Sequence, residues 1–304
     1  MQDNLLKQLS ISVPSPLQPL SIDVSSSGPA IAVKRDDLIH PVISGNKWRK
    51  LAQTLQHIQD SAPTEQVRIV SFGGGYSNHL HALSYCCKLL NWQLIACIRG
   101  NYLGNLSPML QDMHQWGSEL VWLTKSEYKQ RSEATFVAQL QQRFHATAVI
   151  PEGGSARDNL DGFLPFVDEI PNSVDAIICP VASGGTMAGL LHAISKRERH
   201  IDVHGIAVLK GQGYLEKLVT DLLPGSKQDI HIHHDFHFGG YAKHNDQLQS
   251  FCQSFGAIHN LPLEPVYSGK LFYGALTLLQ TRQLDQYDNV IFLHTGGMQG
   301  ARQD

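Results

Sequence analysis

Short apolar runs alternate with longer stretches of helical period along most of the chain. The runs have strand length and an uninterrupted apolar character, which is typical of strands buried on both faces. They lie at residues 67–72, 94–99, 120–123, 147–150, 176–181, 203–208 and 289–294. Between them, apolar residues at helical spacing predict helices at 47–60, 79–90, 108–116, 127–144, 186–196, 214–222, 245–255 and 270–282. This alternation predicts an α/β fold of open, mostly parallel, twisted sheets flanked by helices.

Paired glycines follow four of the predicted strands. Parallel sheets bind ligands at the carboxyl ends of their strands, against the N-termini of the following helices. Because glycine lets the backbone come close to a ligand, four segments of this chain can approach one bound molecule. The turns contain Gly73-Gly74-Gly75, Gly153-Gly154, Gly184-Gly185 and Gly296-Gly297.

The composition is that of a globular protein rather than a nucleic-acid binder. The chain has 304 residues, of which 42% are hydrophobic, and this length suits two domains with cores of their own. It carries 24 Lys and Arg against 27 Asp and Glu, so its net charge is −3. Nucleic-acid-binding domains show a basic surplus instead, and we therefore predict no nucleic-acid partner.

Nothing in the sequence predicts a membrane span or an export signal. No apolar run approaches the ~18 residues of a membrane helix, and the first residues lack the charged and apolar regions of a signal peptide. The cysteines are odd in number and form no C-x-x-C pair. We expect a cytoplasmic protein with buried free thiols and no membrane partner. The cysteines are Cys86, Cys87, Cys97, Cys179 and Cys252.

The turn Ala182-Ser183-Gly184-Gly185-Thr186 joins an apolar strand to a predicted helix. Its backbone amides, the helix N-terminus and the hydroxyls of Ser183 and Thr186 could cradle a phosphate group. It is neither a Walker loop nor a G-x-G-x-x-G fingerprint. Taken alone, a tight turn that needs positive φ explains the glycines equally well.

Lys47 stands just after a Gly-Asn turn, at the start of a predicted helix. A lone lysine in such a place is usually a solvated side chain. Together with a phosphate cradle it suggests pyridoxal phosphate (PLP), whose aldehyde forms a Schiff base with lysine and whose ring takes up electrons. Ser77 and Asn78 follow the first glycine turn and would face such a ligand, although both are also favoured helix N-caps.

On these motifs, the sequence resembles the D-cysteine desulfhydrase and 1-aminocyclopropane-1-carboxylate (ACC) deaminase family. The resemblance implies a PLP-dependent enzyme with the fold of the tryptophan synthase β-subunit, known as fold type II. The matching stretches follow one another in family order over nearly the whole chain. They are residues 14–17, 34–38, 45–51, 73–79, 104–105, 151–155, 182–186, 264–270 and 294–297.

The resemblance implies roles toward the cofactor. Lys47 matches the lysine that forms the Schiff base and, once the substrate displaces it, serves as the base at Cα. Asn78 matches the asparagine that binds the PLP 3-hydroxyl, and residues 182–186 match the phosphate turn. The implied cofactor-binding set is Lys47, Asn78, Ala182, Ser183, Gly184, Gly185, Thr186, Ser268, Thr295 and Gly296.

The resemblance also implies a substrate side to the site. Ser77 and His79 match residues that border the substrate carboxylate, and the serine is discussed in ACC deaminases as a base or nucleophile. Tyr267 matches a tyrosine beside the substrate, and Tyr241 matches a second one less closely. The implied catalytic residues are Lys47, Ser77 and Tyr267; the implied substrate-binding residues are Ser77, Asn78, His79, Tyr241 and Tyr267.

Ser268 and Thr295 bear on the reaction, because ACC deaminases have Glu and Leu at these positions whereas D-cysteine desulfhydrases have hydroxyl residues. A carboxylate keeps the pyridine nitrogen of PLP protonated, and a hydroxyl allows it to stay neutral. Opening a cyclopropane ring needs strong activation, but a thiolate leaves readily. We therefore favour α,β-elimination of D-cysteine, or of a β-substituted D-alanine, to pyruvate, ammonia and sulfide. The alternatives are ACC deamination, or a racemase or serine/threonine deaminase on the same fold.

The chain departs from the family pattern beside its Ser-Asn-His motif. The family has Gln before the motif and Thr-Arg after it, where this chain has Tyr76 and Leu80-His81. The bulk of Tyr76 could reshape the substrate pocket. A protein that keeps the fold without the activity is therefore a further alternative.

Histidines are frequent between residues 231 and 237. Along a strand, His231 and His233 would share one face and could bind a metal ion. No cysteine stands near them, and the ligand spacing of a structural zinc site is missing. We prefer a polar surface strand or loop here and predict no metal.

The family fold implies two domains with PLP in the cleft between them. The large domain is expected to comprise residues 1–51 and 158–304, and residues 52–157 form the small domain inserted between them. Lys47 then leads into the small domain, which contributes Ser77 and Asn78, while the large domain contributes the phosphate turn. The expected partner is a small amino-acid substrate, and a homodimer is usual in the family.

Overall fold

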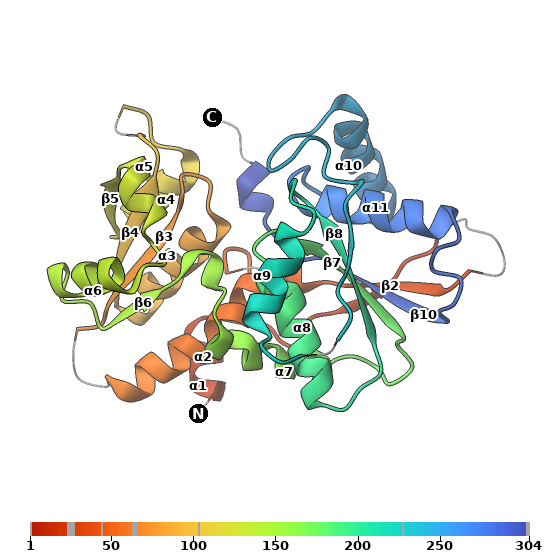
Figure 1. Ribbon diagram of the computed structural model, residues 1–304, viewed down its shortest axis with the longest axis horizontal. Coiled ribbons are helices and arrows are strands. Elements are labelled where there is room, and N and C mark those ends of the chain that lie inside the picture. Colours follow the sequence, from red (N-terminus) through yellow and green to blue (C-terminus); the bar gives the residue numbers. More distant parts are fainter. Residues whose placement is uncertain are drawn as a thin grey trace.

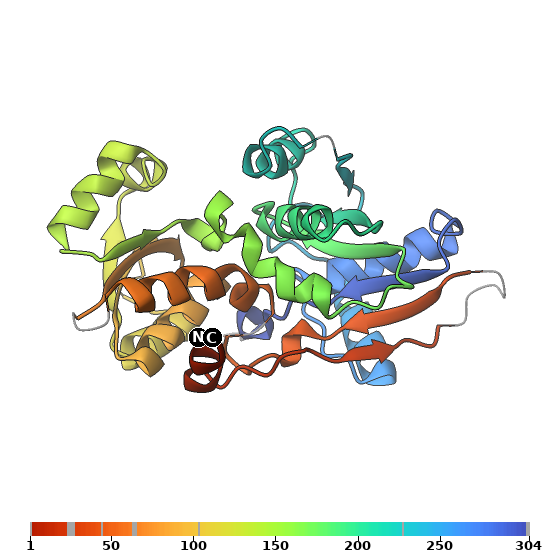
Figure 2. The ribbon, with the colours of Figure 1, turned by 90° about the horizontal axis from the view of Figure 1, so that it is seen from below.

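The structure is a computed structural model that describes residues 2–22, 28–43, 45–62, 66–102, 104–226 and 228–301. Two β-sheets lie side by side, each packed between helices (Figure 1). Within the described ranges, one sheet has six strands in the order β1-β2-β10-β7-β8-β9, and the other has four in the order β5-β4-β3-β6. Figure 2 shows the same two bodies from below, with α2 reaching from one toward the other.

The elements follow one another along the chain as strands and helices in turn. The strands are β1 (Leu17–Pro19), β2 (Ala30–Lys34), β3 (Arg68–Gly74), β4 (Gln93–Arg99), β5 (Glu119–Leu123), β6 (Ala148–Ile150), β7 (Ala176–Val181), β8 (Asp202–Ala207), β9 (His231–His233) and β10 (Asn289–Leu293). The α-helices are α1 (Gln2–Gln8), α2 (Asn46–Ser61), α3 (Asn78–Leu90), α4 (Pro108–Gln115), α5 (Lys125–Lys129), α6 (Ala134–Arg143), α7 (Leu164–Asp168), α8 (Gly185–Lys196), α9 (Tyr214–Leu222), α10 (Asp246–His259) and α11 (Ser268–Gln280).

The four-stranded sheet is parallel throughout and buries both of its faces. Successive residues of β3 point to opposite sides, so Ile69 joins a core with α2, α3 and α4, whereas Val70 and Phe72 join a second core with α6. The strands are therefore continuously apolar, and their carboxyl ends all meet at one edge.

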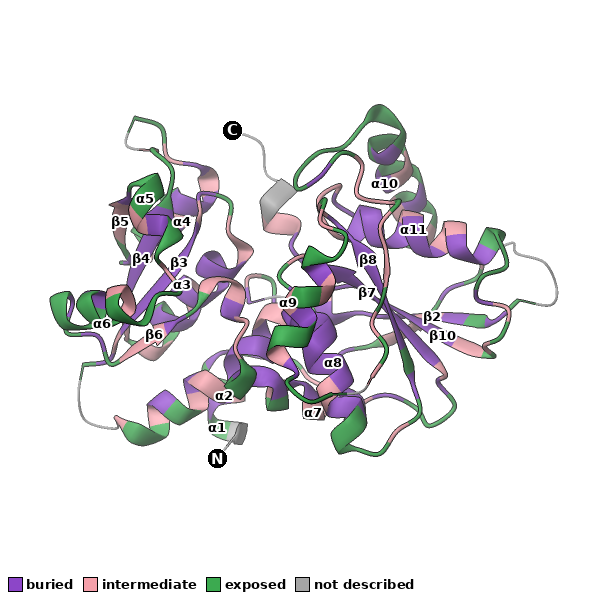
Figure 3. Ribbon diagram, in the orientation of Figure 1, coloured by how far each residue is buried: buried purple, intermediate pink, exposed green. Residues whose placement is uncertain are grey.

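The six-stranded sheet is parallel except for β1, which pairs antiparallel with β2. Ile177 and Cys179 of β7 pack under α7, α8 and α9, and the alternate residue Ile178 packs under α10 and α11. Figure 3 shows the central strands of both sheets, such as β3, β4, β7 and β8, as mostly buried, while parts of the covering helices such as α6 and α9 are exposed.

These features confirm the predicted α/β architecture with mostly parallel sheets. All seven predicted strands are present, and their ends differ from the prediction by no more than two residues. The strands β1 and β2 were not predicted, because β2 is short and rich in alanine and acquires its role only by pairing with β10. The predicted domain limits at residues 52 and 157 stay predictions. Within the described ranges, no helix is both long and apolar enough to cross a membrane.

The single helix predicted over 127–144 is wrong, since two short helices, α5 and α6, occupy this stretch. A capping box between Thr124 and Glu127 starts α5 early. The chain then leaves helical geometry, and the Arg131 guanidinium reaches sideways to Glu152 over 2.6 Å. Glu133, with extended φ and ψ, starts α6 as its N-cap residue.

Candidate active site

The carboxyl ends of the strands bring remote segments of the predicted site together. Gly45 has φ 63°, and a Cβ there would overlap the carbonyl of Thr295, so the turn before α2 packs on the turn after β10. A Cβ on Gly297 would lie 2.9 Å from Asn78 Nδ2 and 4.0 Å from Tyr267 Cδ2. The turn beside Lys47 thus meets the turn after β10, which itself meets the starts of α3 and α11.

Lys47 stands in the first turn of α2, and its amine is partly buried. Its Nζ donates to Asn46 Oδ1 over 2.7 Å, and the Asn46 amide donates to Thr186 Oγ1 over 2.8 Å. Burial lowers the pKa of Lys47 to about 8. An amine with this pKa gains and loses a proton near neutral pH. Through Asn46 it is linked by hydrogen bonds to Thr186, the last residue of the predicted phosphate turn.

Lys50 belongs to the same site, although it is not among the residues expected from the sequence. It lies three residues after Lys47 and therefore on the same face of α2. Its Nζ lies 3.1 Å from Ser155 Oγ and 3.4 Å from Ser183 Oγ. Burial, and then the charge of Lys47, lower the pKa of Lys50 well below its usual value. The K-x-x-K spacing at a helix start was the signal that could have identified it.

The predicted phosphate turn lies between β7 and α8, as expected. Gly184 adopts a left-handed conformation with φ 75°, and α8 begins at the next residue. Gly185 has no room for a side chain, because a Cβ would overlap Ser155 Oγ and lie 3.0 Å from Lys50 Nζ. Hydroxyls, helix amides and an ammonium group therefore converge on one point.

Ser77 and Asn78 stand at the N-terminus of α3. Ser77 caps the helix, since its Oγ accepts from Leu80 N over 3.2 Å, which is the structural role considered from the sequence. The first amides of a helix have no helical carbonyl to donate to, so this end can still bind an anion. The side-chain oxygen of Asn78 is buried without a hydrogen-bond partner among the described residues.

His79 turns its imidazole into the protein interior. Nε2 lies 2.8 Å from Ser71 Oγ, which in turn donates to Ile150 O over 2.8 Å. Nε2 therefore carries the ring hydrogen, and Nδ1 is a bare acceptor that finds no partner in the described part of the chain. Burial, followed by the charges of Lys47 and Lys50, lowers the pKa of His79 to about 3. The ring is thus neutral beside two lysines.

Tyr267 and Tyr241 meet, although their residues lie far apart in the sequence. Tyr267 OH donates to Tyr241 OH over 3.0 Å, and the ring centroids are 6.0 Å apart at 71°. Tyr241 is 46% exposed, so this pair stands at the edge of the site. Burial, and then Tyr241, raise the pKa of Tyr267 well above its usual value.

The hydroxyls of Ser268 and Thr295 differ in their availability. Ser268 is wholly buried; its Oγ accepts from Glu264 N over 2.9 Å and lies 3.1 Å from Glu264 Oε1. Glu264, which the sequence analysis did not select, also caps α11 by accepting from Tyr267 N and Ser268 N. Thr295 is 6% exposed, and its hydroxyl has no hydrogen-bond partner among the residues described. Thr295 is therefore the hydroxyl that is free to meet a ligand.

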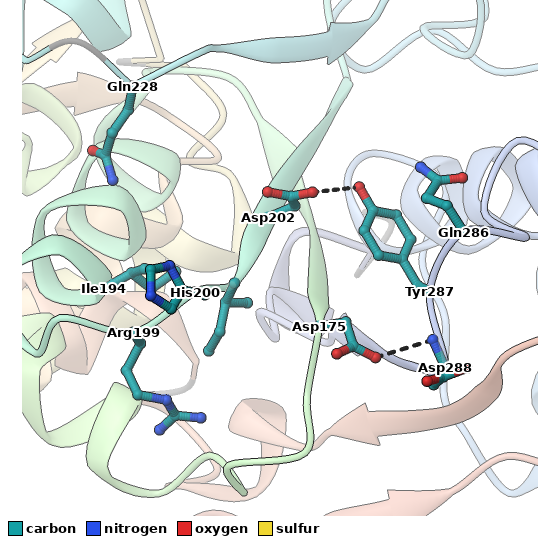
Figure 4. A pocket seen from close by; sticks show the side chains of 10 residues that line it. Asp175, Ile194, Arg199, His200, Asp202, Gln228, Gln286, Tyr287 and Asp288 are labelled. Atoms are coloured by element: carbon teal, nitrogen blue, oxygen red, sulfur yellow. Dashed lines mark hydrogen bonds between the residues drawn. The ribbon is translucent and has the colours of Figure 1, made fainter.

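A surface pocket of about 490 Å³ lies apart from these residues (Figure 4). It opens where β7 and β8 begin, so it is at the opposite end of the sheet from the glycine turns. Two of its hydrogen bonds are internal, from Tyr287 OH to Asp202 and from Asp288 N to Asp175. Its lining contains none of the predicted site residues; it consists of Asp175, Ile194, Arg199, His200, Ile201, Asp202, Gln228, Gln286, Tyr287 and Asp288.

The histidine-rich stretch forms the edge strand β9. His204 of β8 stacks against His231 and His233, with ring centroids 5.7 and 5.5 Å away. Tyr287 OH donates to Asp202, so it accepts from His204 Nε2 over 2.8 Å, and His204 Nδ1 lies 3.2 Å from His233 Nε2. In the described ranges, no three His, Cys, Asp or Glu side chains come together as metal ligands.

The residues that converge on the site fit a phosphorylated aldehyde such as PLP. Lys47 and Lys50 are two buried amines for which the described residues supply no carboxylate partner, so a bound anion would stabilise their protonated forms. The glycine turn and the start of α8 add backbone donors for a phosphate group. The unpartnered Asn78 oxygen can accept from a ligand hydroxyl.

Comparisons with known proteins agree with this fit. A sequence model of the family described as "Pyridoxal-phosphate dependent enzyme" matches residues 11–296. A Thermotoga maritima protein named "Putative 1-aminocyclopropane-1-carboxylate deaminase" is 31% identical over 94% of this chain and 95% of its own. A "D-cysteine desulfhydrase" of Salmonella paratyphi A is 25% identical over 94% of this chain and 92% of its own. The crystal structure of an "ACC deaminase homologue" superposes with a TM-score of 0.77 at 27% identity, covering 99% of this chain and 96% of that one.

Proposed function

Since this chain belongs to the family of pyridoxal-phosphate-dependent enzymes, we propose that it is a lyase that eliminates the β-substituent of a small D-amino acid. D-cysteine is the first choice of substrate. With one water, it would yield pyruvate, ammonia and hydrogen sulfide, which balances in every element and needs no oxidant. The observation that carries this choice is the available hydroxyl of Thr295 together with the lack of a carboxylate at position 268, where ACC deaminases have Leu and Glu; the Ser268 hydroxyl itself is bonded to Glu264.

The cofactor would be held by the groups that meet at the strand ends. Residues 182–186 and Lys50 would bind its phosphate, Asn78 its 3-hydroxyl and Lys47 its aldehyde carbon. When bound, PLP supplies an electrophilic carbon and an aromatic ring that takes up electrons from the substrate. Thr295, with Gly296, would meet the ring; its hydroxyl is available because it makes no hydrogen bond to any of the described residues.

Lys47 would move the α-proton. Its pKa of about 8 leaves a substantial fraction of the amine unprotonated at mildly alkaline pH, as a general base requires. The bond from Asn46 holds Nζ in one place, and the neutral His79 adds no competing positive charge.

The substrate carboxylate would bind at the start of α3. The Ser77 hydroxyl accepts from Leu80 N, so its own hydrogen stays available to a carboxylate oxygen. The first amides of the helix, at Asn78 and His79, add donors and partial positive charge. Tyr267 and Tyr241 would close the opposite side and keep the reacting atoms away from bulk water.

ACC deamination is the second candidate, because relatives with that name reach 31% identity over nearly the whole chain. That reaction would open the cyclopropane ring and release 2-oxobutanoate and ammonia. Opening the cyclopropane ring requires the cofactor ring to take up electrons more strongly than the loss of a thiolate does. In this site, the buried carboxylate behind Ser268 belongs to Glu264, which already accepts three backbone hydrogen bonds.

One substrate panel tests both candidates. Purified protein loaded with PLP is incubated with D-cysteine, L-cysteine, 3-chloro-D-alanine, D-serine and ACC, and pyruvate, 2-oxobutanoate and sulfide are measured. The proposal predicts pyruvate with sulfide from D-cysteine at the highest kcat/KM. If 2-oxobutanoate from ACC exceeds it, the second candidate replaces the first. Racemisation without an oxo acid would exclude both and favour a racemase.

The domain limits, the homodimer and the cytoplasmic location expected from the sequence complete the proposal. Size-exclusion chromatography with light scattering would measure the oligomeric state. Hydrogen exchange would test whether residues 52–157 open as a unit separate from the rest of the chain.

A further inference from the structure

Three residues on one face of α11 bind a segment that comes from elsewhere in the chain. Tyr267, Lys270 and Gly274 follow one another at spacings of three and four residues, which places them in a single stripe at the start of the helix. Segment 236–241, between β9 and α10, lies along this stripe. It ends at Tyr241, at the edge of the candidate active site.

The contacts run in antiparallel order. At one end Phe236 packs on Gly274, where a Cβ would lie 2.8 Å from the phenyl ring. In the middle, Lys270 Nζ donates to Gly240 O over 2.8 Å. At the other end, Tyr267 OH donates to Tyr241 OH over 3.0 Å. The helix therefore holds the segment at three successive points.

Lys270 is completely buried, which is unusual for a lysine and needs compensating bonds. Its second bond goes to Val208 O over 3.0 Å, and Val208 N donates to Val181 O, the residue just before the phosphate turn. The ammonium group thus joins the end of β8 to the backbone of the residue next to Tyr241.

We propose that Lys270 is a positioning residue which, with Gly274 on the same face of α11, seats segment 236–241 and thereby holds the Tyr241 hydroxyl against Tyr267. Tyr241 is 46% exposed and receives its bond from Tyr267, so the backbone on either side must carry its position. The proposal rests on the proposed function only in taking the two tyrosines as substrate-side residues.

The first test is Lys270→Met, which keeps the length of the side chain and removes its donors. Hydrogen exchange of the PLP-loaded protein should rise at least tenfold in the peptide that contains residues 236–241, while exchange in β3 and β4 stays unchanged. In the assay, kcat/KM should fall about tenfold, as expected when the hydrogen bond that seats the backbone beside Tyr241 is lost. The losses of kcat/KM in Lys270→Met and Tyr241→Phe should not multiply when the two substitutions are combined. The kcat/KM of the double variant should stay within about twofold of that of the less active single variant.

Gly274→Ala tests the same segment without touching a polar group. Alanine favours the helix, so the variant should fold, yet its Cβ displaces Phe236 and should raise exchange in the same peptide. The matched control is Leu279→Ala, which weakens a buried side of α11 that faces away from the stripe and should leave exchange in residues 236–241 unchanged.

Unchanged exchange of residues 236–241 in both Lys270→Met and Gly274→Ala would overturn the proposal, as would fully multiplicative effects with Tyr241→Phe. The exchange measurement needs no substrate. If no amino acid in the panel reacted, the proposed function would fail, and the positioning of the segment would still be decided.

Discussion

Arg49 and Glu169 form a two-bond ion pair inside the protein, with Nη1 donating to Oε1 over 2.7 Å and Nη2 to Oε2 over 2.9 Å. Arg49 stands between the two lysines of the candidate site, so this pair ties their turn of α2 to the residue that follows α7. Asp36 and Lys34 complete a cluster in which two positive and two negative charges balance. The position of Lys47 thus depends on a buried charge network behind it.

Glu169→Gln should destabilise the protein by about 3–5 kcal/mol, because it leaves Lys34 and Arg49 buried with a single carboxylate. The free energy of unfolding is measured by urea titration. The neighbouring Asp168→Asn is a matched control, since its pair with Arg197 is 52% and 41% exposed and should contribute less than about 1 kcal/mol. Equal losses in the two variants would contradict the role of the cluster.

Lys50→Met should weaken PLP binding by roughly 10–100-fold, because it removes a buried ammonium group from the phosphate turn. The Schiff-base absorbance should persist at saturating cofactor. Lys47→Ala is the complementary variant, which should lose that absorbance. A persistent Schiff-base spectrum in Lys47→Ala would place the bond on another lysine, and unchanged PLP affinity in Lys50→Met would exclude its contact with phosphate.

Acid should destabilise the protein through His204. Burial, and then His233, lower its pKa from 6.5 to about 4 in the folded protein. Between these values the unfolded chain binds more protons than the folded one, so stability falls as the pH drops from about 6.5 to 4. The effect is on the order of 3 kcal/mol by the usual conversion of 1.36 kcal/mol per pKa unit. Urea titrations over this range should show it.

His204→Asn should reduce this pH dependence, since Asn has no charge to gain, and the remaining slope should come largely from the buried His79, whose pKa is lowered to about 3. His57→Asn, at an exposed position of α2, is the control and should keep the full slope. An unchanged slope in His204→Asn would assign the acid sensitivity to other groups.

Thr295→Val should change stability by less than about 0.5 kcal/mol, because its hydroxyl makes no bond in the described part of the protein. It should still alter the absorbance of bound PLP. Ser268→Ala should instead cost about 1–2 kcal/mol, since it removes the hydroxyl that accepts from Glu264 N. The reverse pattern would make Ser268 the residue that meets the cofactor.

The buried strands and the candidate cofactor site could be predicted from the sequence because the patterns that indicate them are local. Continuous apolar runs of strand length, such as residues 176–181, indicate buried parallel strands when they alternate with helical stretches. Glycine turns after those strands, with Lys47 and residues 182–186, then indicate where a phosphorylated cofactor would bind. These signals lie within one strand, one turn or one helix start, so they survive without knowledge of the fold.

The remaining features were decided by tertiary structure, because they depend on groups that are remote in the sequence. Lys50 acquires its role from Ser155 and Ser183, which are more than a hundred residues away. Ser268 looks free in the sequence, yet burial turns its hydroxyl to Glu264 and leaves Thr295 as the available group. The histidines of β9 stack against His204 of β8, a contact that the pattern of residues 231–237 did not reveal. In each case the desolvation of a polar group determines which partner it takes, and only the packed structure shows which partners are within reach.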